Sequence, residues 1–242
     1  MTRTVSRLLI ASSLVLLTAN PAAAEAVLKP FSLQYEVIYR GMSAGSAELD
    51  LQSEGNDRWR YSSVNEARGL FRLAFPGEIS QTSIFRQQAA EIVPLQYRAD
   101  DGSTATARDI SIDFDYGNSR LRGTAENKSV DLPLTPGVQD PLSVQISVIL
   151  TLANGKSPQS YSLIDKQEIK RYDYRYEGQA KLTTPAGDFD TVIWSSSRVG
   201  SSRRTRVWYA PSLGYLPLQA ERRKGEQVEW SMRLRRLKSS AE

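Results

Sequence analysis

Carboxylates, serines and lysines are the side chains with which this sequence could carry out acid–base or nucleophilic chemistry. The 242 residues include no histidine and no cysteine. This excludes a Ser-His-Asp triad, a thiol nucleophile and a metal site built on histidine or thiolate ligands. Asp109, Asp113 and Asp115 lie close together, but alternation places them on the polar face of a strand. Their spacing also lacks the glycine and terminal glutamate of an EF-hand.

Paired carboxylates can hydrolyse glycosides, and Asp188 and Asp190 form such a pair on either side of Phe189. The two side chains share an outward strand face, and a chain with 27 acidic residues offers many similar pairs. The sequence has no glycine-rich phosphate loop of the Walker or dinucleotide type. We therefore predict no enzyme activity, no catalytic residue, no cofactor and no metal.

Aromatic side chains are the first candidates for binding. The stretch "VWYAPSLGYLPLQAER", residues 207–222, is two apolar strand-like runs separated by a Pro211–Gly214 turn. Four aromatic residues in strand-like runs are either core or ligand contacts, because a sheet without disulfides also needs large apolar side chains for its core. They are Trp194, Trp208, Tyr209 and Trp230.

Basic side chains in the last quarter are the second candidates. Residues 25–202 have 19 Lys and Arg against 23 Asp and Glu, whereas residues 203–238 have 10 against 3. A hairpin that turns near Ser212 brings two basic clusters together at its far end. The cluster is either a solvated strand end or a docking patch for anionic lipid headgroups or an acidic partner. Its candidate binding residues are Arg203, Arg204, Arg206, Arg222 and Arg223.

The candidate binding residues lie in segments whose alternating apolar side chains are typical of β-strands. In "FSLQYEVIYRG", five apolar residues from Phe31 to Tyr39 alternate with other residues, and similar runs continue to the C-terminal region with Gly or Pro turns between them. This spacing predicts a mainly β fold, a curved antiparallel sheet of half-barrel or sandwich type. Residues 25–242 are expected to form a single domain.

One segment, near residues 140–153, is predicted to be the main helix. Asp140 and Pro141 suit a helix N-terminus, and Asn154 and Gly155 suit a C-terminus. One helical face would carry Leu142, Ile146, Ile149, Leu150 and Ala153. Alternating β-branched residues leave a strand as the alternative. The segment is apolar on nearly all sides, so we expect the sheet to bury it deeply.

The first 24 residues have the pattern of a cleavable signal peptide. Arg3 and Arg7 precede an apolar run from Leu8 to Thr18, and three alanines end at residue 24. We expect cleavage before Glu25 and export to a bacterial periplasm as a soluble chain. No cysteine follows the apolar run, so it is not expected to be a lipoprotein, and no later stretch is apolar enough to span a membrane.

Four segments, in order along the mature chain, resemble the domain-of-unknown-function 3108 family of exported bacterial proteins. They are "FSLQYEVIYRGMSAGSAELDL", "LPLTPGVQDPLS", "LTTPAGDFDTV" and "VWYAPSLGYLPLQAER". The resemblance implies an exported β-rich domain and supports the helix at Asp140, but it implies no activity and no catalytic residues. A weaker architectural similarity is to periplasmic lipoprotein carriers, in which a curved sheet encloses a helix and an apolar cavity.

These observations support three hypotheses about function. The first is a non-enzymatic periplasmic protein that binds or handles an apolar or lipid-like envelope component. The second is an envelope protein-interaction module without a small ligand, and the third is a hydrolase of envelope glycans or esters. An open-mouthed apolar cavity would favour the first hypothesis, a fully packed interior the second, and a cleft with converging carboxylates the third. No binding to nucleic acid is expected.

Overall fold

A computed structural model describes residues 25–74, 76–103 and 106–239 of the chain. The segment predicted to be a signal peptide, residues 1–24, lies outside them. The first half of the fold contains β1 (Phe31–Tyr39), β2 (Met42–Gly55), β3 (Arg58–Ala67), α1 (Phe71–Ala74), β4 (Ile79–Gln88), β5 (Glu91–Asp100), β6 (Ile110–Asp115), β7 (Arg120–Ala125) and β8 (Lys128–Pro133). The second half contains α2 (Ser143–Ala153), β9 (Ser160–Asp165), β10 (Glu168–Thr184), β11 (Gly187–Arg198), β12 (Arg203–Ala210), β13 (Leu216–Lys224) and β14 (Gln227–Ser239).

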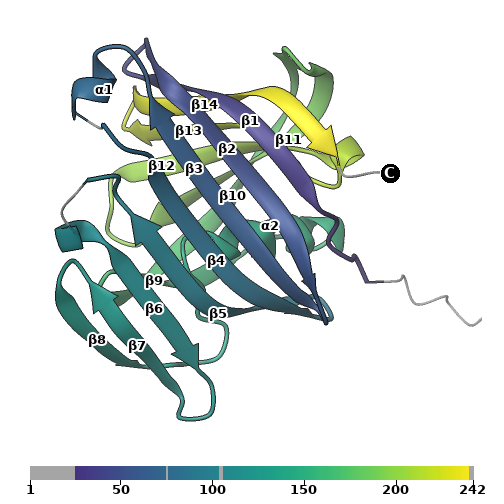
Figure 1. Ribbon diagram of the computed structural model, residues 1–242. Helices are drawn as coiled ribbons and strands as arrows, with labels where there is room; N and C mark the ends of the chain where they lie inside the picture. The colour runs from purple at the N-terminus through teal and green to yellow at the C-terminus, as the bar shows by residue number, and fades with distance from the viewer. Residues whose placement is uncertain (1–24, 75, 104–105, 240–242) are drawn as a thin grey trace, which may run out of the picture.

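All the described strands belong to one antiparallel sheet, which confirms the predicted fold class. The strand order is β8-β7-β6-β5-β4-β3-β2-β1-β14-β13-β12-β11-β10-β9. Strands β1–β8 form one meander and strands β9–β14 form the other, with each strand paired to the next along the chain. The pairing of β1 with β14 joins the two meanders, and β8 and β9 are the edge strands. The sheet curves without closing into a barrel, and α2 lies between the front strands β1–β5 and the rear strands (Figure 1). Among the described residues, no helix has the length and apolarity needed to cross a bilayer.

Helix α2 confirms the predicted helix. The carboxylate of Asp140 accepts hydrogen bonds from the backbone N–H groups of Leu142 and Ser143, both at 2.8 Å. Asp140 therefore caps the turn that leads into the helix, although the regular helix begins three residues later. At the other end, Gly155 adopts φ +68° and its N–H donates to the carbonyl of Leu152, which ends the helix in a left-handed turn.

The burial of α2 follows the prediction with one exception. Leu142, Ile146, Ile149 and Leu150 are buried, as are Val144 and Val148 on other sides of the helix. The prediction that Ala153 shares the buried face is wrong, because Ala153 is exposed in the last turn. The C-terminal end of the helix lies at the end of the sheet where β1 begins, because the Asn154 side chain accepts a hydrogen bond from the N–H of Ala26 at 2.9 Å.

The interior is packed at that end and opens toward the other. Along β1, Phe31, Leu33 and Tyr35 are 5%, 0% and 2% exposed, whereas Val37 is half-buried and Tyr39 is 37% exposed. These five alternating side chains share one strand face. Burial along this face therefore decreases toward the end of the molecule that carries α1 and the β1–β2, β11–β12 and β13–β14 turns. We call this end the mouth.

Candidate apolar cavity

A cavity of about 320 Å³ lies between α2 and the strands of the second half of the sheet. Helix α2 and the turn before it contribute Pro141, Val144 and Ile149 to the lining. Aromatic residues from β1, β10, β11, β12 and β14 form much of the opposite wall: Tyr35, Tyr172, Tyr174, Trp194, Tyr209 and Trp230. The alternating side chains of these strands place one aromatic set on the inner face of the sheet.

Three buried tyrosine hydroxyl groups of this lining stay neutral at ordinary pH. Burial is the largest cause that raises the pKa of Tyr35, Tyr174 and Tyr209 above the usual value of 10.0. The hydroxyl of Tyr35 donates to the carbonyl of Pro217 at 2.5 Å. The tyrosines thus offer ring surface and neutral hydroxyls, which suits an apolar molecule.

Polar side chains occupy one end of the same cavity. Asp165, Thr205 and Arg222 line both the apolar cavity and a polar recess of about 250 Å³ beside it. Arg203 contributes to the recess from the start of β12. An apolar body with a few polar groups at one end is the usual composition of a small-molecule binding site.

A second cavity, also of about 320 Å³, lies on the mouth side of Trp230 and Met232, which line both cavities. Its other lining residues include Val37, Tyr39 and Phe71. The rings of Tyr39 and Phe71 meet edge to face with their centroids 5.9 Å apart, so α1 packs against the end of β1. The described residues that line this second cavity come from the sheet and from α1, because α2 occupies the other end of the interior.

The structure separates the four predicted aromatic residues. Trp194, Tyr209 and Trp230 line the first cavity. Trp208 precedes Tyr209 in β12 and therefore points to the opposite face of the sheet. There it is 7% exposed, and the guanidinium of Arg206 lies over its ring at 4.8 Å from the centroid. Trp208 thus lies apart from the three aromatic residues that line the cavity.

The predicted hairpin is present, and the pairing of β12 with β13 places the two basic clusters opposite each other. It turns through Pro211–Leu213 and Gly214, which has φ +66°, and Arg204 pairs with Arg223 across the two strands. Strand alternation nevertheless divides the arginines between the faces. Arg203 and Arg222 lie at the inner recess, whereas Arg204 and Arg206 share the outer face with Trp208.

Glutamates pair with all five of these arginines. Glu229 lies 2.8 Å from Arg203 and 3.9 Å from Arg222. Glu177 pairs with Arg206 at 2.5 Å and with Arg204 at 3.1 Å. Arg223 pairs with Glu221 and Glu226, each at 3.6 Å. The local acids therefore offset much of the charge that the sequence concentrates in this quarter.

Glu177 lies half-buried beside the two outer arginines, Arg204 and Arg206. Burial of its carboxylate acts to raise the pKa, but the hydroxyl of Ser195 and the guanidinium groups of Arg206 and Arg204 outweigh it and lower the pKa below 4.5. Glu177 is thus ionised at neutral pH and paired with the two outer arginines.

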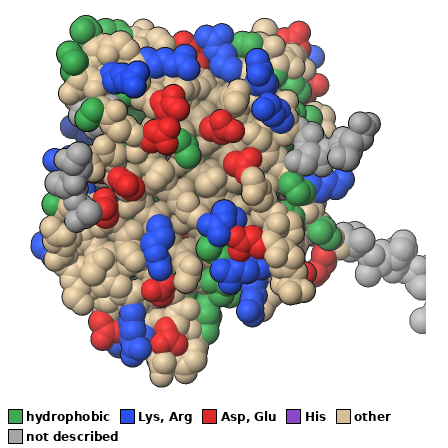
Figure 2. Space-filling view, viewed as in Figure 1, with side chains coloured by type: hydrophobic (Ala, Val, Ile, Leu, Met, Phe, Trp, Pro, Cys, Tyr) green, Lys and Arg blue, Asp and Glu red, His purple; other side chains and the backbone are tan. Residues whose placement is uncertain are grey.

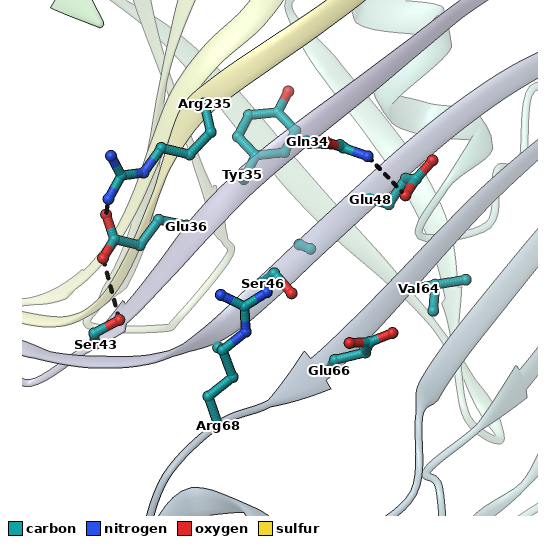
Figure 3. Close-up of a pocket in the computed structure, with 12 residues that line it drawn as sticks. Gln34, Tyr35, Glu36, Ser43, Ser46, Glu48, Val64, Glu66, Arg68 and Arg235 are labelled. Atoms are coloured by element: carbon teal, nitrogen blue, oxygen red, sulfur yellow. Dashed lines mark hydrogen bonds and ion pairs between the residues drawn. The ribbon is translucent and has the colours of Figure 1, made fainter. Parts of the chain in front are cut away.

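A further hollow, about 480 Å³, is a polar trough on the outer face of β1–β3 (Figure 3). Arg235 pairs with Glu36, which also accepts a hydrogen bond from the Ser43 hydroxyl at 3.1 Å. Glu48 accepts a hydrogen bond from the side chain of Gln34 at 3.3 Å. Most of the charged groups in the trough thus already have partners within it, and its polar lining does not suit an apolar molecule.

The acidic residues considered in the sequence for a calcium site or for catalysis do not line the cavities described above. Asp113 pairs with Arg98 at 2.7 Å, and Asp115 pairs with Arg122 at 3.3 Å. Asp190 is exposed near Lys181. Asp113, Asp115 and Asp190 are therefore surface charges on strands, as the polar-face interpretation of the sequence expects.

Tyr172 and Tyr174 line the cavity but are missed by the sequence-based selection of aromatic residues. The sequence pattern that could have identified them is the alternation of Tyr172, Tyr174 and Tyr176 along "IKRYDYRYEG". This alternation places all three on one face, and Tyr176 packs against Trp194 with ring centroids 5.5 Å apart.

Comparison with known proteins gives a family and a fold. A family model described as "Protein of unknown function (DUF3108)" matches residues 34–225. No curated protein shows significant similarity to the chain.

Among solved structures, a beta-barrel-like protein of the domain of unknown function DUF1849 from Brucella abortus matches with a TM-score of 0.56 and 10% identity, over 90% of this chain and 100% of that chain. A Bacteroides fragilis protein with a YmcC-like fold gives a TM-score of 0.40 at 9% identity, over 88% and 97% of the two chains. The Pseudomonas aeruginosa MucA/MucB complex gives 0.38 at 12% identity, over 88% of this chain and 52% of that chain. At this level of identity, the Brucella abortus match shows a shared fold alone.

Proposed function

The chain belongs to the family described as protein of unknown function DUF3108, and we propose that it is a non-enzymatic envelope protein that binds an apolar or lipid-like molecule inside its curved sheet. The observation that carries the proposal is the aromatic cavity between α2 and the rear strands. Its volume of about 320 Å³ and that of its neighbour across Trp230 fall within the range typical of small-molecule sites.

The lining supports this function over the alternatives. A protein-interaction module does not need an aromatic interior that remains unfilled, since large apolar side chains stabilise a sheet by packing together. A hydrolase needs a reactive group near the bound substrate. Asp165 is the carboxylate that lines the first cavity, and Lys170 holds it in an ion pair at 2.8 Å. The polar recess with Arg203 and Arg222 instead suits the polar end of an amphipathic molecule.

The cellular location that fits this function is a bacterial periplasm, reached by removal of residues 1–24. The alanines before Glu25 and the short apolar run ahead of them support this location. An envelope component with an apolar body needs shielding from water in that compartment, and the interior of the sheet would provide it.

Blocking the cavity tests the proposal. Thr205 lines the cavity from the inner face of β12, and Thr205→Phe places a ring in the space. We expect this variant to bind the apolar fluorophore N-phenyl-1-naphthylamine at least about tenfold more weakly than the wild type, because a bulky group in a binding cavity removes contact area. Thr183→Phe is the matched control, since Thr183 is exposed on β10.

Fluorescence titration measures binding, and thermal unfolding checks that both variants fold. Equal affinity of a folded Thr205→Phe variant and the wild type would place the probe outside the cavity and contradict the proposal.

A further inference from the structure

The mouth carries an apolar surface that the cavity does not explain. Nine large hydrophobic residues of the described chain are exposed, and four of them, Tyr39, Met42, Leu70 and Leu73, lie in or directly beside the β1–β2 and β3–β4 connections. Leu70 and Leu73 are 83% and 84% exposed, and Met42 is 57% exposed. Exposed apolar side chains that gather at one place mark interaction surfaces more often than scattered ones do.

The short helix α1 explains why the leucines face solvent. Phe71 points inward onto Tyr39 and lines the mouth-side cavity. Leu70 and Leu73 are three residues apart and therefore lie on a common side of the helical turn, away from the cavity. The N–H of Arg68 donates to the carbonyl of Ala44 at 2.8 Å, which fixes this connection beside the β1–β2 turn.

Basic residues lie in the same two connections as these apolar side chains. Arg40, Arg68 and Arg72 are exposed, and within the described part of the chain none of the three forms an ion pair with an acid. Arg40 lies over the ring of Tyr39 at 5.3 Å. This differs from the hairpin arginines, which glutamates neutralise. Apolar and basic side chains adjoin at the corner of the molecule that holds α1 (Figure 2).

We propose that the mouth docks on the surface of an anionic lipid bilayer, with Leu70 and Leu73 inserted between the headgroups and Arg40, Arg68 and Arg72 against lipid phosphates. Apolar side chains flanked by arginine are the composition of interfacial membrane anchors. Basic residues near an anionic surface add attraction that salt screens. Docking in this way would set the mouth-side cavity against the membrane surface.

This inference depends on the exposed corner and not on a molecule in the cavity, so it can fail independently of the proposed function. The measurement is co-sedimentation at low salt with phosphatidylethanolamine vesicles, with and without phosphatidylglycerol. We expect the wild type to bind better to vesicles that contain phosphatidylglycerol.

Replacing both leucines, Leu70→Ser with Leu73→Ser, is expected to weaken this binding by roughly a hundredfold, about tenfold for each leucine removed from an apolar environment. Replacing Arg40, Arg68 and Arg72 together with Ser is expected to abolish the preference for phosphatidylglycerol. The matched control is Val27→Ser, because Val27 is 74% exposed near the opposite end of the sheet and should bind like the wild type.

Two results would overturn the inference. One is equal vesicle binding by the leucine variant and the wild type. The other is the absence of wild-type binding to either vesicle, which would assign the apolar corner to a protein partner instead. The changed side chains are exposed, so circular dichroism should show all variants folded like the wild type.

Discussion

At the residue scale, Asp140 shows how one side chain sets the position of the helix in the interior. It is fully buried, and besides capping the backbone it accepts a hydrogen bond from the hydroxyl of Ser83 in β4 at 2.6 Å. The cap was predictable from Asp-Pro before an apolar run. The hydrogen bond between Asp140 and Ser83 was not predictable, because 57 residues separate the two and nothing in the sequence around either one indicates that they meet.

The hydrogen bonds of Asp140 predict a larger loss than an exposed cap would give. Asp140→Ala should lower the free energy of unfolding by about 2–4 kcal/mol, since it removes the cap and leaves buried donors without an acceptor. Asp140→Asn keeps a side-chain oxygen and should lose less. Urea unfolding of both variants measures the difference, and similar small losses for the two would show that the acceptor role is not important.

At the element scale, turn and cap residues made helix α2 and the hairpin of β12 and β13 predictable. The Pro211–Gly214 stretch locates the hairpin turn, and Asn154 with Gly155 locates the helix end. Alternation also places Trp208 and Tyr209 on opposite faces, but it does not tell which face is inner. That depends on the curvature of the sheet and on where α2 packs, which are properties of the assembled fold.

Burial around α2 gives a second stability prediction. Ile146 is 0% exposed, so Ile146→Ala should cost about 2–5 kcal/mol by removing buried contacts and leaving a cavity. Ala153 is exposed in the last turn, so Ala153→Ser should change stability by less than about 0.5 kcal/mol. Equal losses at the two positions, measured by thermal unfolding, would mean that α2 does not lie in the interior as described.

At the scale of the whole molecule, the pairing of β1 with β14 and the length of α2 create the cavities. The pairing curves two meanders around one space. Helix α2 spans only 11 residues and fills the end of that space near Ala26, so the mouth side remains open. The alternation of apolar residues predicted the strands but not the cavities, because a cavity arises where side chains from distant strands fail to meet. The exposed leucines at α1, Leu70 just before it and Leu73 within it, were missed for a similar reason, because a short apolar segment in a sequence does not indicate whether the core covers it.

The central claim is that the aromatic cavity holds an apolar or lipid-like molecule. Native mass spectrometry of protein expressed from the full sequence, with residues 1–24 included, and purified from periplasm tests it most directly because it requires no assumption about the ligand. The account predicts the mass of a chain that begins at Glu25, together with an additional bound mass. Organic extraction should remove this bound mass, and analysis of the extract should identify it as lipid. Thr205→Phe should carry less of it than Thr183→Phe. A wild-type protein that carries no additional mass, with no lipid in the extract, would contradict the account.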